Sequence, residues 1–235
     1  MINKFWAKKK IKIGLLILTW NEIDGITNLW PKLPKKLFTE ILAIDPGSSD
    51  GTIEYYKKNK IPYIIQNKRG RAEAFRIAFN KTKCDYLLIY SPDGNEDYND
   101  IPKLIQEAKK GFDMVIGSRF ISGGANEEDN AFFPTRKWAN IAFTFIANKL
   151  FNKTNRYITD TINGYRIISK KMFNSLSPNA EGYAIEYQLT IRALKNNYKI
   201  KEIPTKEYKR IGNKSKASSI PTGINFLRML FKEIF

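Results

Sequence analysis

Short apolar runs, each ended by a polar turn and followed by a helical pattern, constrain the fold of this chain more than any other feature. The run at residues 11–18 is almost continuously isoleucine and leucine, as expected for a strand buried on both faces of a parallel sheet. Shorter runs follow at residues 41–44, 63–66, 86–90 and 114–117, with helical patterns between them. This alternation predicts βαβ crossovers and therefore a single α/β domain with a mostly parallel central sheet flanked by helices.

A polar turn closes each of these expected strands. In chain order the turns read TWNE, DPGSSDGT, NKRGR, SPDGNED and GSRF. Parallel strands end at the same edge of a sheet, and open α/β sheets bind their ligands at that edge. We therefore expect these turns to gather into one ligand site.

The composition limits the chemistry of such a site. The absence of histidine excludes histidine-based acid–base or nucleophilic catalysis and histidine-ligated zinc. The only cysteine, Cys84, excludes an internal disulfide and a cysteine-rich zinc site. The formal net charge of +17 favours an anionic partner, namely nucleic acid, an anionic membrane face or a phosphorylated small molecule, although part of it reflects a general lysine bias.

The amino-terminal sequence predicts neither a signal peptide nor a transmembrane helix. The first apolar run is broken by Asn21 and Glu22 and is not followed by a small-residue cleavage site. No uncharged apolar run in the sequence is long enough to span a bilayer. Together with the single cysteine, these features predict a cytoplasmic location.

Each polar turn, taken alone, also has an ordinary structural interpretation. In SPDGNED, Asp93 and Asn95 are suitably spaced to face one Mg²⁺ or Mn²⁺ ion, but the same residues suit an Asx turn. The glycine turn at Arg69 and Gly70 precedes a helix and suits either a phosphate group or no ligand. DPGSSDGT is typical of a loop that caps the following helix.

The order of the turns is more specific than any one of them. The sequence resembles the family 2 glycosyltransferases, which have the Rossmann-like GT-A fold, and most of all their dolichyl- or polyprenyl-phosphate hexosyltransferase branch. LTWNE stands at the family's P-x-Y-N-E, DPGSSDGT at D-D-G-S-x-D-G-T, RGRAEA at its glycine turn and SPDGN at D-x-D. IGSRF, DTINGYR and RIGNKSK match the later motifs, so the resemblance runs from Ile11 to Lys216.

The resemblance implies a role for each matching residue. The residues implied to bind the nucleotide-sugar are Thr19, Trp20, Glu22, Asp45, Arg69, Gly70, Ser91, Arg210 and Lys214. Asp93 and Asn95 are implied to hold the metal ion, Mg²⁺ or Mn²⁺, on the diphosphate. Arg119, Arg136 and Arg166 are expected to face the acceptor. Two departures weaken the match: Ser91 replaces the first Asp of D-x-D, and Pro46 replaces the second Asp of D-D-G-S.

The expected reaction is hexose transfer, with inversion, from a UDP- or GDP-sugar. A polyprenyl phosphate acceptor is already an anion and needs no strong base, whereas a saccharide hydroxyl needs a carboxylate to deprotonate it. The candidate catalytic residues are Asp160 first and Glu186 second, together with Arg119. Glu186 is equally well explained as a solvated or helix-capping residue.

Three functional interpretations stay open. The favoured one is a metal-dependent hexosyltransferase acting on polyprenyl phosphate, bound peripherally at the inner face of the cytoplasmic membrane. The second is a soluble glycosyltransferase acting on a saccharide hydroxyl in surface polysaccharide synthesis. The third is a non-catalytic GT-A-like binding protein. Nucleic acid is not an expected partner, because the aromatic residues fall in strands and helix faces rather than among basic residues.

Two helical patterns bear on the membrane question. The helix expected from Thr135 has apolar residues available for burial at Trp138, Ile141, Phe145 and Leu150. With Arg136, Lys137 and Trp138 at its start, it is also a second candidate for an interfacial helix. Residues 217–235, after a GT-A domain at residues 1–216, form an amphipathic pattern. Its residues near one face are Ile224, Leu227, Leu230, Phe231 and Ile234. This face suits packing on the domain core, a second copy of the chain in a homo-oligomer, or the surface of an anionic membrane.

Overall fold

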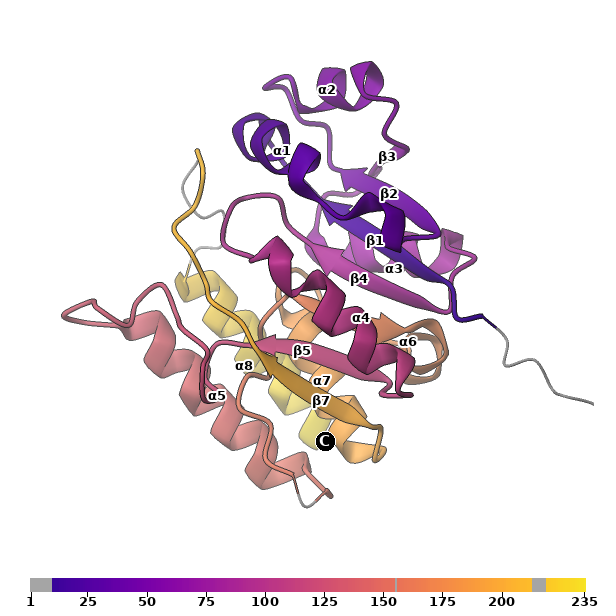
Figure 1. Ribbon diagram of the computed structural model, residues 1–235. Helices are drawn as coiled ribbons and strands as arrows, with labels where there is room; N and C mark the ends of the chain where they lie inside the picture. The colour runs from indigo at the N-terminus through magenta and orange to yellow at the C-terminus, as the bar shows by residue number, and fades with distance from the viewer. Residues whose placement is uncertain (1–9, 155, 213–218) are drawn as a thin grey trace, which may run out of the picture.

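The computed structural model describes residues 10–154, 156–212 and 219–235, and its centre is a seven-stranded sheet (Figure 1). The strands are β1 (Ile13–Leu18), β2 (Glu40–Asp45), β3 (Tyr63–Ile65), β4 (Tyr86–Tyr90), β5 (Met114–Ser118), β6 (Arg166–Ser169) and β7 (Ile200–Pro204). The helices are α1 (Ile23–Leu29), α2 (Thr52–Lys58), α3 (Arg71–Lys81), α4 (Ile101–Lys109), α5 (Thr135–Phe151), α6 (Lys170–Leu176), α7 (Ala184–Lys195) and α8 (Ser219–Ile234). Short 3₁₀ turns lie at Trp30–Lys32, Lys35–Leu37 and Tyr98–Asp100.

The sheet has the order β3-β2-β1-β4-β6-β5-β7 and is mostly parallel, as predicted. β1 is parallel to β2 and β4, β2 to β3, and β5 to β7. β6 alone runs antiparallel to its neighbours β4 and β5. The five strands whose polar turns were singled out therefore all point the same way, and their turns lie along one edge of the sheet.

The strands form because their side chains are buried on both faces. Every residue of β1 is buried, and alternate residues enter different cores, as the two-residue period of a strand requires. Leu16 and Leu18 pack in one cluster with residues of α3, α6 and α7. Leu15 and Ile17 pack in another with residues of α1, α2 and α4. Helices therefore cover both faces of the sheet, and the predicted α/β class is confirmed.

Helices α5 and α8 form a further layer that packs on α7 rather than on the sheet. A third apolar cluster joins Phe151 of α5, Tyr187 of α7 and Phe226 of α8. The rings of Tyr187 and Phe226 stack with their centroids 5.4 Å apart. Residues of both outer helices lie close to the turns that follow β4 and β5, and therefore close to the expected site.

The large apolar residues of α5 that were available for burial are instead exposed. Trp138 and Phe145 are 54% and 58% exposed, and Ile141 and Leu150 are exposed as well. Apart from Phe151, the buried residues of α5 are small or polar: Thr144, Ala147 and Asn148. Among them, the Thr144 hydroxyl lies 2.8 Å from that of Thr161, and Asn148 Nδ2 donates to the Ile158 carbonyl, which fixes this face against residues 158–161.

Helix α8 divides the apolar residues of its sequence between two faces. Phe226, Met229 and Leu230 are buried against α7. Leu227 and Phe231 are exposed, as are Ile224 and Ile234. No helix in the described ranges is long and apolar enough to cross a membrane.

Candidate active site

The turns after β1 and β2 are held together by buried hydrogen bonds. The fully buried Asp45 carboxylate accepts hydrogen bonds from Thr19 Oγ1 at 2.8 Å and from the Ser48 backbone N–H and hydroxyl. The Thr19 hydroxyl also lies 2.6 Å from the Tyr56 hydroxyl. In the next layer, the Asn21 backbone N–H donates to Ser48 Oγ. Asp45 therefore acts here by shaping the turn that a nucleotide would meet.

Trp20 and Arg69 lie at the open end of the same edge. The guanidinium carbon of the exposed Arg69 lies 4.1 Å from the centre of a Trp20 ring, a cation–π arrangement. Gly70 follows in an extended conformation, and its carbonyl accepts a hydrogen bond from Gln66 Nε2 at 2.9 Å. The buried Glu22 lies 4.0 Å from Arg210. These expected nucleotide residues thus line one continuous stretch of the edge.

The turn after β4 carries the expected metal ligand Asp93. Asp93 Oδ1 accepts a hydrogen bond from the Asn95 backbone N–H, and Asp93 Oδ2 pairs with Arg210 at 2.6 Å. The Ser91 backbone N–H donates to Glu96 Oε2 at 2.7 Å, so the Glu96 carboxylate folds back onto the turn. SPDGNED is therefore a tight turn that presents several oxygen atoms.

The segment after β7 returns across this turn. The Ile211 backbone N–H donates to the Asp93 carbonyl at 2.7 Å, and the Tyr208 N–H donates to the Asn95 carbonyl at 3.0 Å. Gly94 lies between them with φ +94°, and a Cβ there would lie 2.8 Å from an Ile211 side-chain carbon. Glycine at this position therefore permits both the positive φ of the turn and the close approach of Ile211.

The carboxylates of this turn suit a divalent cation. Burial raises the pKa of Asp93, although Arg210 opposes the shift. Burial and the neighbouring Asp93 charge raise the pKa of Glu96 well above its usual range. Two acids crowded in this way gain from a shared cation, and hard cations prefer carboxylate, amide and hydroxyl oxygens such as those of Asn95 and Ser91.

The fit to a metal ion depends on substrate oxygens as well. In the described part of the chain, no group of three or more carboxylate or thiol side chains is arranged to hold a metal ion alone. Mg²⁺ in particular is commonly held by one or two carboxylates together with substrate phosphates. Asp93 with Glu96 meets that pattern, so the residues present fit the expected ion.

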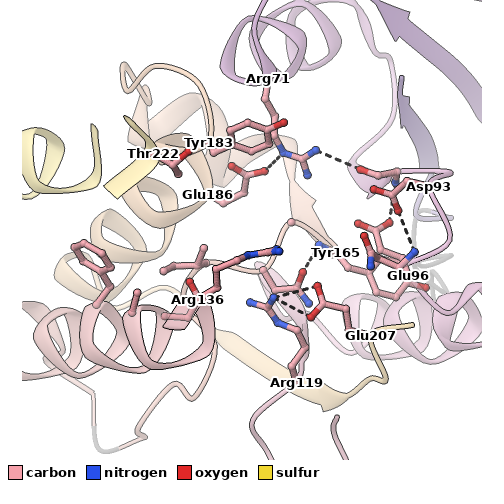
Figure 2. A pocket seen from close by; sticks show the side chains of 18 of the residues that line it. Arg71, Asp93, Glu96, Arg119, Arg136, Tyr165, Tyr183, Glu186, Glu207 and Thr222 are labelled. Carbon is pink, nitrogen blue, oxygen red and sulfur yellow. Dashed lines mark hydrogen bonds and ion pairs between the residues drawn. The ribbon is translucent and has the colours of Figure 1, made fainter. Parts of the chain in front are cut away.

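A pocket of about 320 Å³ begins at this turn and extends to the outer helices (Figure 2). Its polar end is lined by Ser91, Asp93 and Arg210. Its other end is lined by Phe143 of α5 and Phe226 of α8. The volume is typical of a small-molecule site. The pocket therefore joins an anion-binding end to an apolar wall.

Arg119, just after β5, sits in the pocket wall within a buried charge network. Its guanidinium makes two hydrogen bonds to Asp160, from Nε at 2.8 Å and from Nη2 at 3.1 Å. Its third nitrogen, Nη1, faces Glu207 at 3.3 Å. Despite burial, these two carboxylates raise the pKa of Arg119, so it stays charged. Asp160 is fully buried with both oxygens engaged and does not line the pocket.

Arg71, the first residue of α3, forms a second buried network across the pocket (Figure 2). Its Nε donates to Glu186 Oε1, and its Nη1 donates to Ser91 Oγ at 3.2 Å. Despite burial, the Glu186 charge and hydrogen bond raise the pKa of Arg71. Gly164 passes so close that a Cβ there would lie 2.2 Å from Arg71 Nη2.

The two remaining acceptor candidates differ in position. Arg136 points from the start of α5 into the pocket, is about half exposed and pairs with Glu127 at 3.0 Å (Figure 2). Arg166 is fully buried, and its guanidinium donates to the carbonyls of Thr161, Asn163 and Glu186. The expectation that Arg166 contacts the acceptor is not supported, because it lies outside the pocket lining and supports the loop before β6.

The structure brings together seven of the expected residues in the pocket wall. They are Ser91, Asp93, Asn95, Arg119, Arg136, Glu186 and Arg210. Six more lie along the adjacent edge: Thr19, Trp20, Glu22, Asp45, Arg69 and Gly70. Lys214 lies outside the described residues.

The pocket residues that sequence reasoning missed include Arg71, Glu96, Tyr183 and Glu207. Arg71 and Glu96 lie inside turns that were singled out, so their position and charge were usable signals. Tyr183 and Glu207 had no comparable signal, because each meets the pocket only through distant segments of the chain.

Comparisons with known proteins agree with this geometry. The model of the family described as glycosyl transferase family 2 matches residues 15–176, more than half of the chain, and the chain therefore belongs to that family. Glycosyltransferase AglJ of Haloferax volcanii is 27% identical over 199 residues, which cover 84% of this chain and 63% of that protein. Dolichol-phosphate mannosyltransferase of Pyrococcus furiosus is 25% identical over 202 residues, which cover 83% of this chain and 56% of that protein.

The relatives bear on the expected family branch, and one solved structure bears on the expected fold. The chain spans less than two thirds of the length of either relative. The name of the second relative agrees with the branch that the sequence resembles, and the family match agrees with the family, so that recognition is confirmed. Glucosyl-3-phosphoglycerate synthase of Mycobacterium tuberculosis, solved with Mn²⁺, UDP and glucosyl-3-phosphoglycerate, superposes with a TM-score of 0.73 at 17% identity over 97% of this chain and 81% of that one. This likeness concerns the fold alone, and it confirms the GT-A fold.

Proposed function

We propose that this glycosyltransferase moves a hexose from a UDP- or GDP-sugar to a polyprenyl phosphate. The observation that carries the proposal is the continuous pocket between the oxygen-rich turn at Asp93 and the apolar wall of Phe143 and Phe226. One end suits a nucleoside diphosphate and the other suits an isoprenoid chain. The dolichyl-phosphate relative supports the same pairing of substrates.

The donor end would stabilise the leaving group. A Mg²⁺ or Mn²⁺ ion held by Asp93, Glu96 and Asn95 would supply positive charge to the departing diphosphate. Arg210, now paired with Asp93 at 2.6 Å, and Arg71, beside Ser91, place further positive charge at the same end. Fixed charges aimed at a developing anion lower the barrier of such a step.

The acceptor end favours a phosphate over a hydroxyl. A phosphate oxygen attacks the anomeric carbon without prior deprotonation, whereas a hydroxyl needs a base. Asp160, our first candidate for that base, is fully buried and paired with Arg119. Arg136 projects into the pocket beside the apolar wall, where it could hold the acceptor phosphate. Direct attack would invert the anomeric carbon, as the resemblance implies.

The outer helices supply a surface suited to a lipid acceptor. Phe132, Phe133 and Trp138 before and in α5, and Leu227 and Phe231 in α8, are exposed. Their helices also form the apolar wall of the pocket. Apolar residues on a strongly basic protein bind anionic membrane surfaces, so we place the enzyme peripherally on the inner face of the cytoplasmic membrane.

A saccharide hydroxyl remains the second candidate acceptor, and one observation favours it. Glu186 lines the pocket, and one of its carboxylate oxygens has no hydrogen-bond partner among the residues that the structure describes, so a carboxylate is available there. The non-catalytic alternative predicts nucleotide binding without turnover.

The proposal is tested with purified protein, a panel of UDP- and GDP-sugars, and either a short polyprenyl phosphate or a saccharide as acceptor. Each reaction is run with Mn²⁺, with Mg²⁺ and with a chelator. We expect a polyprenyl-phosphate sugar product that requires the divalent ion. Transfer to the saccharide alone would replace the proposal with the second candidate, and nucleotide binding without turnover would favour the non-catalytic one. No nucleotide binding at all would exclude the enzyme.

A further inference from the structure

Glu186 has a buried carboxylate oxygen that accepts no hydrogen bond from any residue in the described part of the chain. Within the described residues, the buried side-chain oxygens that lack a hydrogen-bond partner are Glu186 Oε2 and the Tyr90 hydroxyl. Only Glu186 lines the pocket, and its side chain is 2% exposed. A buried polar atom without a partner is costly, and a charged one more so. This atom therefore indicates a ligand that donates a hydrogen bond.

The position of this oxygen is fixed by its neighbours. Glu186 Oε1 is held by Arg71, which is anchored in turn to Ser91 Oγ at 3.2 Å. The Glu186 backbone carbonyl accepts a hydrogen bond from Arg166 Nη1 at 3.2 Å. Gly164 leaves the room that the Arg71 guanidinium occupies. Arg71 thus fixes one oxygen of the carboxylate and Arg166 fixes the backbone of the same residue, while Oε2 keeps no partner among the described residues.

The chemistry of the surroundings limits the ligand. An ionised carboxylate repels a phosphate group, so Oε2 does not face the diphosphate or an acceptor phosphate. An apolar chain would leave the oxygen unsatisfied. A sugar hydroxyl can donate the missing hydrogen bond. Arg71 bonds both Glu186 and Ser91, so a single side chain separates Glu186 from the turn that is expected to hold the diphosphate.

We infer that Glu186 Oε2 accepts a hydrogen bond from a hydroxyl of the transferred hexose and selects among donor sugars. The inference rests on the proposed function, since it assigns the sugar subsite of the same pocket. Arg71 is a positioning residue: it holds Glu186 in place, and its hydrogen bond to Ser91 connects the sugar subsite to the turn that contains Asp93. A site built to hydrogen-bond a hydroxyl rejects the sugar that lacks it or carries it in the opposite configuration.

The test measures donor binding without acceptor, which separates recognition from catalysis. The free nucleoside diphosphate and the nucleotide-sugar preferred by the wild type are titrated calorimetrically, with Mn²⁺, into the wild type and Glu186→Gln. In the variant, Arg71 retains the amide oxygen, so the amide –NH₂ faces the pocket where an acceptor stood. We expect nucleotide-sugar affinity to fall about 10- to 100-fold, and affinity for the free diphosphate to stay within about twofold.

Two controls identify the atom involved. Glu181→Gln changes an exposed glutamate that pairs with Lys68 at 3.6 Å, and it should leave both affinities unchanged. A series of singly deoxygenated donor sugars should contain one member that binds the wild type weakly and loses no further affinity in Glu186→Gln, because the same hydrogen bond is already missing.

The outcomes separate this inference from the proposed function. If wild-type protein binds no nucleotide-sugar, the proposed function fails first. If it binds the nucleotide-sugar and Glu186→Gln binds it equally well, the sugar subsite is elsewhere. A large fall in kcat with unchanged donor affinity would also overturn the inference, and it would assign Glu186 to the base role instead.

Discussion

Arg210 occupies one oxygen of Asp93, the residue that the sequence marks as a metal ligand. A guanidinium and a divalent cation satisfy the same buried carboxylate in similar ways, because each supplies positive charge to an acid whose burial is otherwise costly. Arg210 belongs to the segment that passes over the Asp93 turn. We therefore expect its guanidinium to pair with a bound diphosphate in place of Asp93.

Replacing Asp93 tests the metal position. Asp93→Asn keeps the size of the side chain and removes its charge, so a divalent ion loses its principal ligand. We expect nucleotide affinity in the presence of Mn²⁺ to fall at least about 10-fold, to the level of the wild type with chelator. Isothermal titration of UDP and GDP, with and without Mn²⁺, measures this change.

The matched control is Asp85→Asn, at the amino end of β4 and therefore at the opposite edge of the sheet. Asp85 accepts a hydrogen bond from the Lys12 backbone N–H, and its replacement should not alter nucleotide binding. Metal-dependent binding that survives in Asp93→Asn would remove Asp93 from the metal site.

Gly164 gives a second prediction at this scale. In Gly164→Ala the new Cβ meets Arg71 Nη2 at 2.2 Å, and the guanidinium must move away from Glu186 and Ser91. Because the end of a long side chain moves rather than the backbone, we expect a stability loss of only about 1–2 kcal/mol but a fall in kcat/KM of at least about 10-fold. Chemical denaturation and steady-state kinetics measure the two effects.

Gly223→Ala is the control for stability, since a Cβ at that position on α8 meets open space. Alanine is the better helix former, so this variant should unfold at the same or a higher denaturant concentration. Full activity in Gly164→Ala would show that the Arg71 link has no functional part.

Single residues were predictable where they belong to a local motif. Ser91, Asp93 and Asn95 fall in one turn, and the structure places all three in the pocket wall. The partners that complete the site come from far along the chain: Arg71 meets Glu186 across 115 positions, and Arg119 meets Glu207 across 88. A local pattern carries no information on such pairs, and for the same reason it could not reveal that Arg166 is buried.

At the scale of elements, strands were easier to predict than helix faces. The run at residues 11–18 contains β1, in which every residue is buried. A strand in the centre of a parallel sheet is apolar on both faces, so its sequence pattern is unambiguous. Helix α5 has apolar residues around much of its surface, so its pattern gave no single face. Contacts of Thr144 and Asn148 with residues 158–161 decide which side is buried.

Helix α8 is fastened to α7 by the carboxylate of Glu233. Its Oε1 accepts hydrogen bonds from Arg192 at 2.7 Å and Gln188 at 2.9 Å, and its Oε2 pairs with Lys195 at 3.0 Å. Burial alone would raise the pKa of Glu233, but these partners outweigh it and lower the pKa below the usual 4.5. The carboxylate must therefore be ionised for the link to hold.

The lowered pKa predicts acid sensitivity of this link. A depressed folded-state pKa stabilises the protein above the unfolded value and loses that contribution as the pH falls below about 4.5. Glu233→Gln should unfold with about 1–2 kcal/mol less free energy than the wild type near neutral pH. The difference should shrink as the pH is lowered through that range, as measured by urea denaturation at several pH values.

An exposed glutamate on α2 provides the comparison. Glu54→Gln changes one exposed charge without a side-chain partner in the described structure, and near neutral pH it should unfold with about the same free energy as the wild type. A Glu233→Gln difference that stays constant across the pH range would mean that the charge of Glu233 does not hold α8.

At the scale of the whole molecule, the proposed membrane contact would combine the net charge of +17 with the exposed apolar residues of α5 and α8. Long-range attraction concentrates a basic protein at an anionic bilayer, and apolar side chains then insert at short range. Residues of the same two helices line the pocket, so under the proposed function a lipid acceptor would reach the pocket close to the membrane surface.

Vesicle binding tests this arrangement. The wild type should sediment with vesicles of phosphatidylglycerol and phosphatidylcholine, and binding should weaken as salt is raised. The double variant Leu227→Ser, Phe231→Ser should bind at least about 10-fold less tightly, since it removes two exposed apolar side chains from α8.

Leu37→Ser is the control, because Leu37 is exposed to a similar degree but precedes β2, away from α5 and α8. It should bind vesicles as the wild type does. Equal binding of the double variant would show that α8 is not the membrane-facing element, and no binding of the wild type would remove the membrane from the proposal.

Residues 205–212, which follow the last strand of the sheet, pass over the turn that contains Asp93 and Asn95. During synthesis, the ribosome therefore releases every strand before it releases the segment that completes the pocket. A nascent chain therefore cannot complete the pocket before its last strand has been made. A chain ended after Pro204 should accordingly lose nucleotide binding, as measured by titration alongside circular dichroism of the remaining fold.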